Sequence, residues 1–138
     1  MSGEFCDTDV LVYAHDAEAG ARKERAQALV ERLWTAGNGV LSVQVLQELY
    51  VTLTRKLAKP MSGEAAREVV SYLAHWQVVA PSASDVVAAI DLTSRWQISF
   101  WDAMVLRTAH IAGATVLWSE DLTDGQDYDG IIVRNPFV

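Results

Sequence analysis

The chain of 138 residues has the length of one domain and is long enough to bury a single sizeable core. Hydrophobic residues make up 51% and charged residues 21%, a globular composition that excludes intrinsic disorder. The net charge of −7 disfavours non-specific nucleic-acid binding, unless metal ions or local basic patches compensate. We therefore expect one soluble domain over residues 1–138.

Features that report on location favour the cytoplasm. Cys6 is the only cysteine, so no internal disulfide can form and a reducing compartment is allowed. The first residues lack the basic region and apolar run of a signal peptide. No apolar stretch approaches the roughly 20 residues that span a bilayer. A cytoplasmic protein without membrane attachment is the expectation.

Short strands alternate with helical patterns along the chain. The first strand lies within residues 4–13, where an apolar run reaches Asp7 and then turns into a weakly helical, charged stretch. Helices are expected over residues 21–35, 43–57, 62–76, 84–96 and 99–112. Further strands are expected over residues 40–42, 78–80, 115–118 and 131–133. The alternation predicts an α/β fold with three layers: a central, mainly parallel sheet of about five short strands, flanked by helices.

The helix expected over residues 43–57 has the clearest apolar stripe of the chain. The stripe consists of Leu46, Leu49, Tyr50, Leu53 and Leu57. Glu48 lies on the opposite face, which for an isolated helix means solvent.

Four acidic residues are expected at one edge of the sheet. All strands of a parallel sheet point the same way, so the strand-to-helix junctions share an edge. Asp7 ends the first strand, Glu48 lies in the helix after the second, and Asp121 follows the fourth. Asp102 lies in the first turn of the last helix, although this helix precedes its strand. Gathered carboxylates repel one another unless a cation neutralises them, and all-oxygen ligation suits Mg²⁺ or Mn²⁺.

Each of these residues also has an ordinary structural explanation. Asp7 and Asp9 follow a strand, where Asp side chains commonly bond to backbone amides of turns and helix starts. Asp102 lies three positions after Ser99, the spacing of a capping box with Asp in place of Glu. Asp121 begins an acidic loop that is explained equally well as solvated, and no Glu follows at the distance that a calcium loop requires.

Four segments resemble the successive motifs of PIN-domain ribonucleases. They are residues 6–14 (CDTDVLVYA), 44–50 (QVLQELY), 99–104 (SFWDAM) and 117–122 (LWSEDL). The resemblance covers nearly the whole chain and is nearest to the VapC-type toxins of bacterial toxin–antitoxin pairs. The first motif of the family usually reads Asp-Thr-Asn-Val, and here Asp9 replaces the Asn. This departure adds one more acid beside the expected metal site.

The resemblance implies a single PIN-like nuclease domain whose catalytic, metal-binding acids are Asp7, Glu48, Asp102 and Asp121. Ser119 matches the small hydroxyl residue of the family. Thr54-Arg55-Lys56, after the second motif, also fits the toxin group. Arg55 and Lys56 are candidates for contact with substrate phosphates, and a solvated basic turn at a helix end is the equal alternative.

The implied activity is Mg²⁺- or Mn²⁺-dependent endonucleolytic hydrolysis of RNA. The cation lowers the pKa of a water molecule and polarises the phosphodiester, and water attacks phosphorus in line. This chemistry requires no histidine, so His15, His75 and His110 are assigned no role.

The resemblance also implies partners: an antitoxin encoded beside the toxin and a second copy of the chain in a homodimer. A carboxylate-lined cleft suits an inhibitor that inserts a basic side chain. The apolar helix surface near Trp34, Leu53 and Leu57 is expected either to hold an antitoxin helix or to belong to the core.

Two other functions compete with this interpretation. Asp7-Thr8-Asp9 is similar to the first motif of haloacid-dehalogenase-like phosphatases, in which the first Asp is a nucleophile. That motif needs Thr or Val where Leu11 stands, and it needs a late lysine, whereas Lys59 is the last lysine here. The other alternative is a non-catalytic PIN-like binding module, which the intact set of four acids disfavours.

Overall fold

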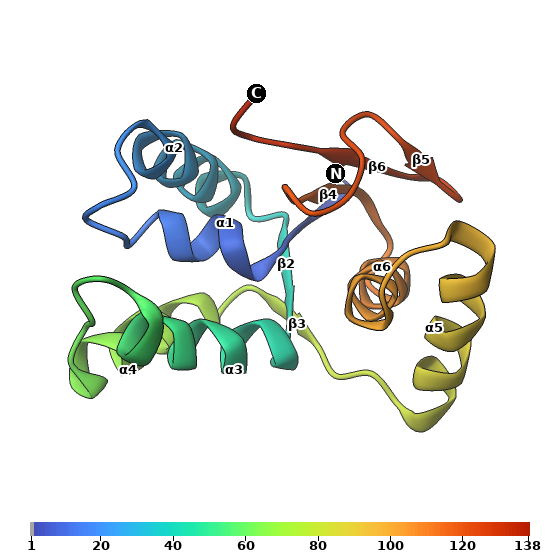
Figure 1. Cartoon of the computed structure of the whole chain (residues 1–138), viewed down its shortest axis with the longest axis horizontal. Helices are drawn as coiled ribbons and strands as arrows, with labels where there is room; N and C mark the ends of the chain where they lie inside the picture. The colour runs from blue at the N-terminus through green and yellow to red at the C-terminus, as the bar shows by residue number, and fades with distance from the viewer. Residues whose placement is uncertain (1) are drawn as a thin grey trace.

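The computed structural model describes residues 2–138, which form one six-stranded sheet with helices around it (Figure 1). The strands are β1 (Gly3–Cys6), β2 (Gly39–Ser42), β3 (Gln77–Val79), β4 (Ala114–Trp118), β5 (Asp127–Tyr128) and β6 (Ile131–Arg134). The helices are α1 (Thr8–Tyr13), α2 (Ala21–Ala36), α3 (Val43–Val51), α4 (Gly63–Leu73), α5 (Ala83–Trp96) and α6 (Phe100–Ile111), and a π-helical turn (Thr52–Lys56) extends α3.

The strand order places a topological switch point between β1 and β4. The order across the sheet is β3-β2-β1-β4-β6-β5, and every neighbouring pair is parallel except β5 and β6. The chain therefore moves outward from β1 to β3 and then returns to the other side of β1. Open α/β sheets bind ligands beyond the carboxyl ends of their strands at such a point.

The helices cover both faces of the sheet, which confirms the predicted three-layer α/β/α fold. Crossovers between parallel strands are right-handed, so reversing the direction of travel moves the connecting helices to the other face. Helices α1 to α4 accordingly lie on one side of the sheet, and α5 and α6 lie on the other (Figure 1). None of the helices within residues 2–138 is both long and apolar enough to cross a membrane.

Two predicted elements differ from the structure. The first strand ends at Cys6, because Asp7 caps a helix that begins at Thr8. The sheet has six strands and not about five, because Asp127 and Tyr128 pair antiparallel with β6 inside the segment expected to be a polar loop. Tyr128 is buried, so this short strand also contributes to the core.

The buried face of α3 is rotated from the predicted stripe. Val45, Leu49 and Leu53 are buried, whereas Tyr50 is 42% exposed. Consecutive helical residues are about 100° apart, so Glu48 flanks the buried face instead of opposing it. Glu48 is exposed, as expected, and its carboxylate accepts a hydrogen bond from Thr8 on α1.

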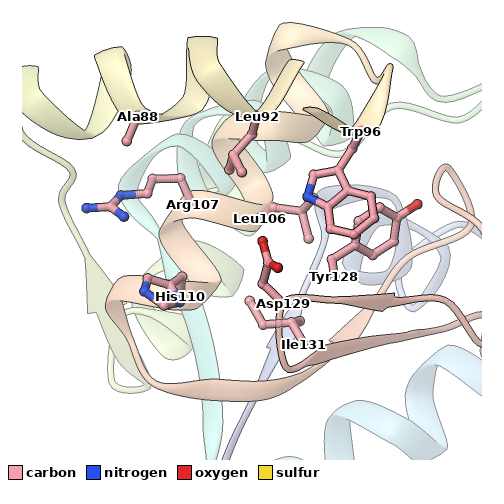
Figure 2. Close-up of a pocket in the computed structure, with 9 residues that line it drawn as sticks. All are labelled: Ala88, Leu92, Trp96, Leu106, Arg107, His110, Tyr128, Asp129 and Ile131. Carbon is pink, nitrogen blue, oxygen red and sulfur yellow. The ribbon is translucent and has the colours of Figure 1, made fainter. Parts of the chain in front are cut away.

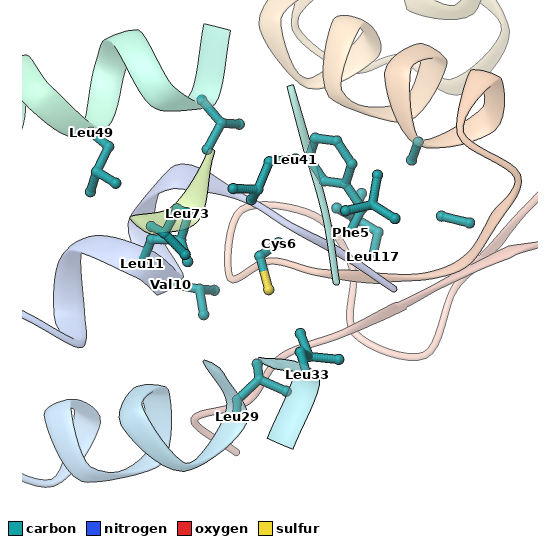
Figure 3. Close-up of a cluster of buried hydrophobic side chains, with 14 of the residues drawn as sticks. Phe5, Cys6, Val10, Leu11, Leu29, Leu33, Leu41, Leu49, Leu73 and Leu117 are labelled. Atoms are coloured by element: carbon teal, nitrogen blue, oxygen red, sulfur yellow. The ribbon is translucent and has the colours of Figure 1, made fainter. Parts of the chain in front are cut away.

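The core lies on both faces of the central strands (Figure 3). Phe5 and its Cα partner Leu117 lie on the α6 side, and Cys6 lies with Leu29 and Leu33 on the α2 side. All four residues of β2 are buried, as expected for a strand covered on both faces. Burial also raises the pKa of the Cys6 thiol, so the only cysteine is a protonated core residue.

Candidate metal centre

Asp7 is held at the switch point by the sheet and by the start of α1. Cys6 pairs with Trp118 across β1 and β4, and the Asp7 backbone N–H donates to the Trp118 carbonyl at 3.0 Å. Asp7 Oδ1 then accepts the backbone N–H of Thr8 at 2.8 Å and caps α1. The capping explanation considered for the sequence is therefore confirmed. The cap uses one carboxylate oxygen, and the other faces the end of β4.

Ser119 links Asp7 to Asp121. Its side chain is fully buried directly after β4. The Ser119 hydroxyl donates to Asp7 Oδ2 at 3.0 Å and accepts the backbone N–H of Asp121 at 3.1 Å. Through these two hydrogen bonds, the buried Ser119 hydroxyl orients Asp7 and Asp121 relative to each other.

Asp102 brings a third carboxylate to the same place from the other face of the sheet. Ser99 caps α6 by accepting the Asp102 backbone N–H at 3.1 Å, as the capping-box spacing predicted. One carboxylate oxygen each of Asp7, Asp102 and Asp121 lies within 4.8 Å of the others. Three segments far apart in sequence thus place three carboxylates in one cluster, which we call the acid cluster.

Burial and mutual repulsion disfavour the charged forms of the acid cluster. Burial raises the pKa of Asp7 to about 7, although hydrogen bonds from Thr8 and Ser119 lower it, and the charge of Asp121 raises it further. The pKa of Asp121 is also raised, by burial and by the charge of Asp102. A hard divalent cation would relieve this repulsion, and the all-oxygen donor set fits Mg²⁺ or Mn²⁺.

Two further acids lie beside the acid cluster. Burial raises the pKa of Asp9 to about 6, and repulsion from Asp121 contributes. The Glu48 carboxylate accepts hydrogen bonds from Thr8 Oγ1 at 3.0 Å and from Gln44 Nε2 at 2.7 Å. Glu48 therefore adjoins the acid cluster through Thr8, the residue next to Asp7, and is not one of the three converging carboxylates.

The basic residues predicted to contact phosphates lie farther away. Arg55 and Lys56 are exposed at the end of the π-helical turn that follows α3. Arg55 is seven positions after Glu48, which corresponds to about 10 Å along the helix axis. Their contact with substrate remains a prediction.

The histidines and Glu120 lie in other surroundings. His15 and His75 lie in the turns that follow α1 and α4, and their Nδ1 atoms lie 3.0 Å from the carbonyl oxygens of Leu11 and Ser71 in those helices. Glu120, although it directly precedes Asp121, forms an ion pair with Arg22. The local sequence gives no indication of this ion pair, because Arg22 and Glu120 are 98 positions apart.

His110 is exposed on α6 and lines a cavity of about 140 Å³ between α5, α6 and the β5–β6 hairpin (Figure 2). The other lining residues are Ala88, Leu92, Trp96, Leu106, Arg107, Tyr128, Asp129 and Ile131. The cavity contains none of the acid-cluster residues and is separate from it.

Comparison with known proteins identifies the family. The PIN-domain family model matches residues 5–123, which contain every residue of the acid cluster. The chain belongs to the PIN-domain family. The resemblance seen in the four sequence motifs is thereby confirmed, and the phosphatase alternative is not supported.

Solved structures with the same fold include toxins of toxin–antitoxin pairs. VapC20 of Mycobacterium tuberculosis, described as a toxin that cleaves the sarcin-ricin loop, is 21% identical with a TM-score of 0.66, and the match covers 86% of this chain and 90% of that one. A Klebsiella pneumoniae toxin–antitoxin complex is 18% identical (TM-score 0.71, 98% of each chain), and DNA-bound VapBC of Salmonella typhimurium is 17% identical (TM-score 0.67, 99% of each). Among curated proteins, none matches the chain.

Proposed function

We propose that this PIN-domain protein is a metal-dependent endoribonuclease that hydrolyses RNA phosphodiester bonds, with residues 1–138 acting as one nuclease domain. The observation that carries the proposal is the convergence of three carboxylates within 4.8 Å at the switch point of the sheet. The similarity to the M. tuberculosis toxin, which is described as cleaving the sarcin-ricin loop, supports RNA as the substrate.

The acid cluster would hold Mg²⁺ or Mn²⁺. Asp7, Asp102 and Asp121 would each bind the ion through a carboxylate oxygen, and such ions keep several waters. Glu48, oriented by Thr8, would act through one of these waters. When bound, the ion supplies stabilisation of phosphate charge and a lowered pKa for the attacking water.

The chain's own residues would orient the acids and the RNA. Ser119 fixes the positions of Asp7 and Asp121 by its two hydrogen bonds. Asp9, on the first turn of α1, would adjust the charge around Asp121. Arg55 and Lys56 would contact RNA phosphates away from the cleaved bond, where basic side chains add sequence-independent affinity.

Cleavage of a single-stranded RNA in Mg²⁺ or Mn²⁺, with excess EDTA as comparison, tests the proposal. Products should carry 5′-phosphates, because water and not the ribose 2′-hydroxyl attacks. Asp7→Asn and Asp102→Asn should abolish cleavage, whereas Asp124→Asn, the same change in a loop acid outside the cluster, should not. Undiminished cleavage in EDTA, or cyclic phosphate ends, would contradict the proposal.

The nuclease would act as the toxin of a toxin–antitoxin pair. The Klebsiella and Salmonella neighbours are described as members of toxin–antitoxin complexes. An acidic chain with unneutralised carboxylates suits an antitoxin that inserts Arg or Lys into the acid cluster. A homodimer would place two such sites together.

Part of the apolar surface expected to receive an antitoxin helix is available. Leu53 is fully buried and belongs to the core, and Leu57 packs against it. Trp34 is half-buried, stacks on exposed Tyr72 with centroids 3.9 Å apart, and lines a depression with Val30 between α2 and α4. This depression would receive an apolar helix face.

Expression of the chain alone and with its neighbouring gene tests the toxin assignment. We expect arrested growth with the chain alone, and normal growth with the neighbour or with the Asp7→Asn variant. Equal growth in all cases, with soluble protein verified, would remove support for the toxin role.

A further inference from the structure

Trp101 differs from the other four tryptophans in its exposure. Its side chain is 62% exposed, whereas Trp34, Trp76, Trp96 and Trp118 are half-buried. An exposed indole forgoes the stabilisation that burial of its large apolar surface would give. The fold therefore gains little from the position of this ring.

Trp101 is the sequence neighbour of an acid-cluster residue, and its ring rests against a partly buried phenylalanine. It directly precedes Asp102 in the first turn of α6. The Phe100 ring meets the Trp101 ring edge-on, with centroids 5.1 Å apart and planes inclined by 71°. Phe100 in turn packs against a core cluster that includes Ala103 and Met104. The Trp101 indole is thus held by its contact with Phe100, while most of its surface stays open to solvent.

The negative charge of the chain makes an uncharged means of binding RNA useful near the acid cluster. The net charge of −7 works against the approach of RNA phosphates. Two arginines near the sheet are already paired, Arg22 with Glu120 and Arg32 with Glu4. Stacking of a base on an aromatic ring supplies affinity that needs no positive charge and tolerates any base.

We propose that Trp101 stacks on the nucleobase next to the scissile phosphate and thereby positions the RNA over Asp7, Asp102 and Asp121. The inference rests on the proposed nuclease function. It makes Trp101 a residue that touches substrate, and it assigns the local affinity for RNA to stacking more than to charge.

A substrate series with one abasic site, moved nucleotide by nucleotide along a short cleavable RNA, tests the stacking directly. With the parent protein, we expect the abasic site next to the cleaved bond to lower kcat/KM by about 5- to 150-fold, mainly through KM, the effect of losing one stacked base. With Trp101→Leu, which keeps an apolar side chain but no aromatic face, the intact RNA should show this loss. The same abasic site should then add almost nothing.

Three further variants separate stacking from other roles. Trp101→Tyr should restore most of the affinity, because it keeps an aromatic face. Tyr50→Leu, which removes the aromatic ring of a residue 42% exposed on α3, should cleave like the parent. Thermal unfolding of Trp101→Leu should match the parent, since the ring is mainly exposed.

The outcomes distinguish this inference from the function on which it rests. If the parent cleaves in Mg²⁺ but the abasic penalty is equal in parent and Trp101→Leu, the stacking is wrong and the nuclease stands. If Trp101→Leu instead dissociates a dimer without changing that penalty, the ring belongs to an interface between copies and the stacking is again wrong. If the parent cleaves no RNA, the proposed function fails and the stacking fails with it.

Discussion

Glu4, near the start of β1, and Asp7, directly after its end, are three positions apart, and their carboxyl groups have contrasting surroundings. Glu4 accepts hydrogen bonds from Arg32 at 3.0 Å, Trp118 Nε1 at 2.8 Å and Asn38 at 3.2 Å. Partial burial by itself raises the pKa of Glu4, but these hydrogen bonds and the Arg32 charge outweigh it. The pKa of Glu4 therefore lies below its usual value, and ionised Glu4 stabilises the fold.

Asp7 has no cationic partner within residues 2–138. Ser119 and the Thr8 N–H donate to it, yet burial and the charges of Asp121 and Asp9 raise its pKa to about 7. Ionised Asp7 therefore destabilises the folded chain. One end of the strand uses its carboxylate for stability, and the other keeps carboxylates in an arrangement that only an added cation makes favourable, as expected at a functional site.

Asp7→Asn, which removes the ionisable group of Asp7, should have the largest effect on stability. In EDTA at pH 8, we expect the free energy of unfolding to rise by about 2–4 kcal/mol, because the pKa of Asp7 is raised from 3.8 to about 7 and one pKa unit corresponds to about 1.4 kcal/mol. Asn keeps the helix cap. Urea unfolding measures the change, and Asp124→Asn is the matched control. A less stable Asp7→Asn variant would show that ionised Asp7 is not destabilising.

Addition of Mn²⁺ should remove the penalty from the parent protein. At a free concentration 100 times the dissociation constant, binding to the folded state alone stabilises by about 2.7 kcal/mol. Thermal unfolding in Mn²⁺ should therefore shift upward for the parent and not for Asp7→Asn or Asp102→Asn. Equal shifts in all three proteins would place the ion elsewhere.

The stability of the metal-free parent should fall as the pH rises from about 4 to 8. The folded-state pKa values of Asp7 (about 7) and Asp9 (about 6) exceed their usual value of 3.8. Their contribution is therefore fully present below pH 4 and is lost as the pH rises through the folded values. We expect a loss of about 1–3 kcal/mol between pH 5 and pH 8, measured by urea unfolding in EDTA. The Asp7→Asn profile should be flatter, and a parent profile that rises over this range would contradict the assignment.

The convergence of Asp7 and Asp121 could be predicted from the sequence, because the carboxyl ends of parallel strands share an edge. Asp102 was also expected at this edge, but the rule does not account for it, since its helix precedes its strand and lies on the other face of the sheet; the motif resemblance gave the second reason to include it. Glu48 is exposed, as expected, but its hydrogen bond from Thr8 could not be predicted from the helix alone. Tyr50 was expected in the buried stripe and is 42% exposed, whereas Val45, which was not expected there, is buried.

Contacts between segments that are distant in sequence could not be predicted from the local sequence. Glu120 carries a carboxylate like its neighbour Asp121, but it accepts hydrogen bonds from Tyr13, at 2.7 Å, and from Arg22. The strand at Asp127–Tyr128 was missed because its residues lie among turn-forming aspartates and glycines. In both cases long-range pairing outweighs the local preference.

Arg32→Ala, which removes the cationic partner of Glu4, should lower the stability of the fold. The arginine is about half exposed, so solvent screens the pair and the expected loss of stability at pH 7 is about 0.5–1 kcal/mol. The pKa of Glu4 is lowered in the folded state, so this contribution is present above pH 4.5 and is lost as the pH falls. Urea unfolding at pH 7 and pH 3 measures the difference, with Arg25→Ala, an exposed residue of the same helix, as control. An equal loss at both pH values would assign the effect to packing.

Lys59→Ala should have the smallest effect. Lys59 Nζ lies 3.3 Å from Glu18 Oε1, but the two side chains are 74% and 53% exposed. Exposed pairs gain little, because water screens the attraction and two long side chains lose freedom, so we expect a change within about 0.5 kcal/mol. Comparison of Lys59→Ala with Lys59→Met by urea unfolding, at low salt and in 0.5 M salt (about 4 Å of screening length), separates charge from packing. A loss above about 1 kcal/mol that disappears in salt would show that charge pairing stabilises this fold even in solvent. The contrast between Glu4 and Asp7 would then depend on the presence of a partner alone, and burial would not be its cause.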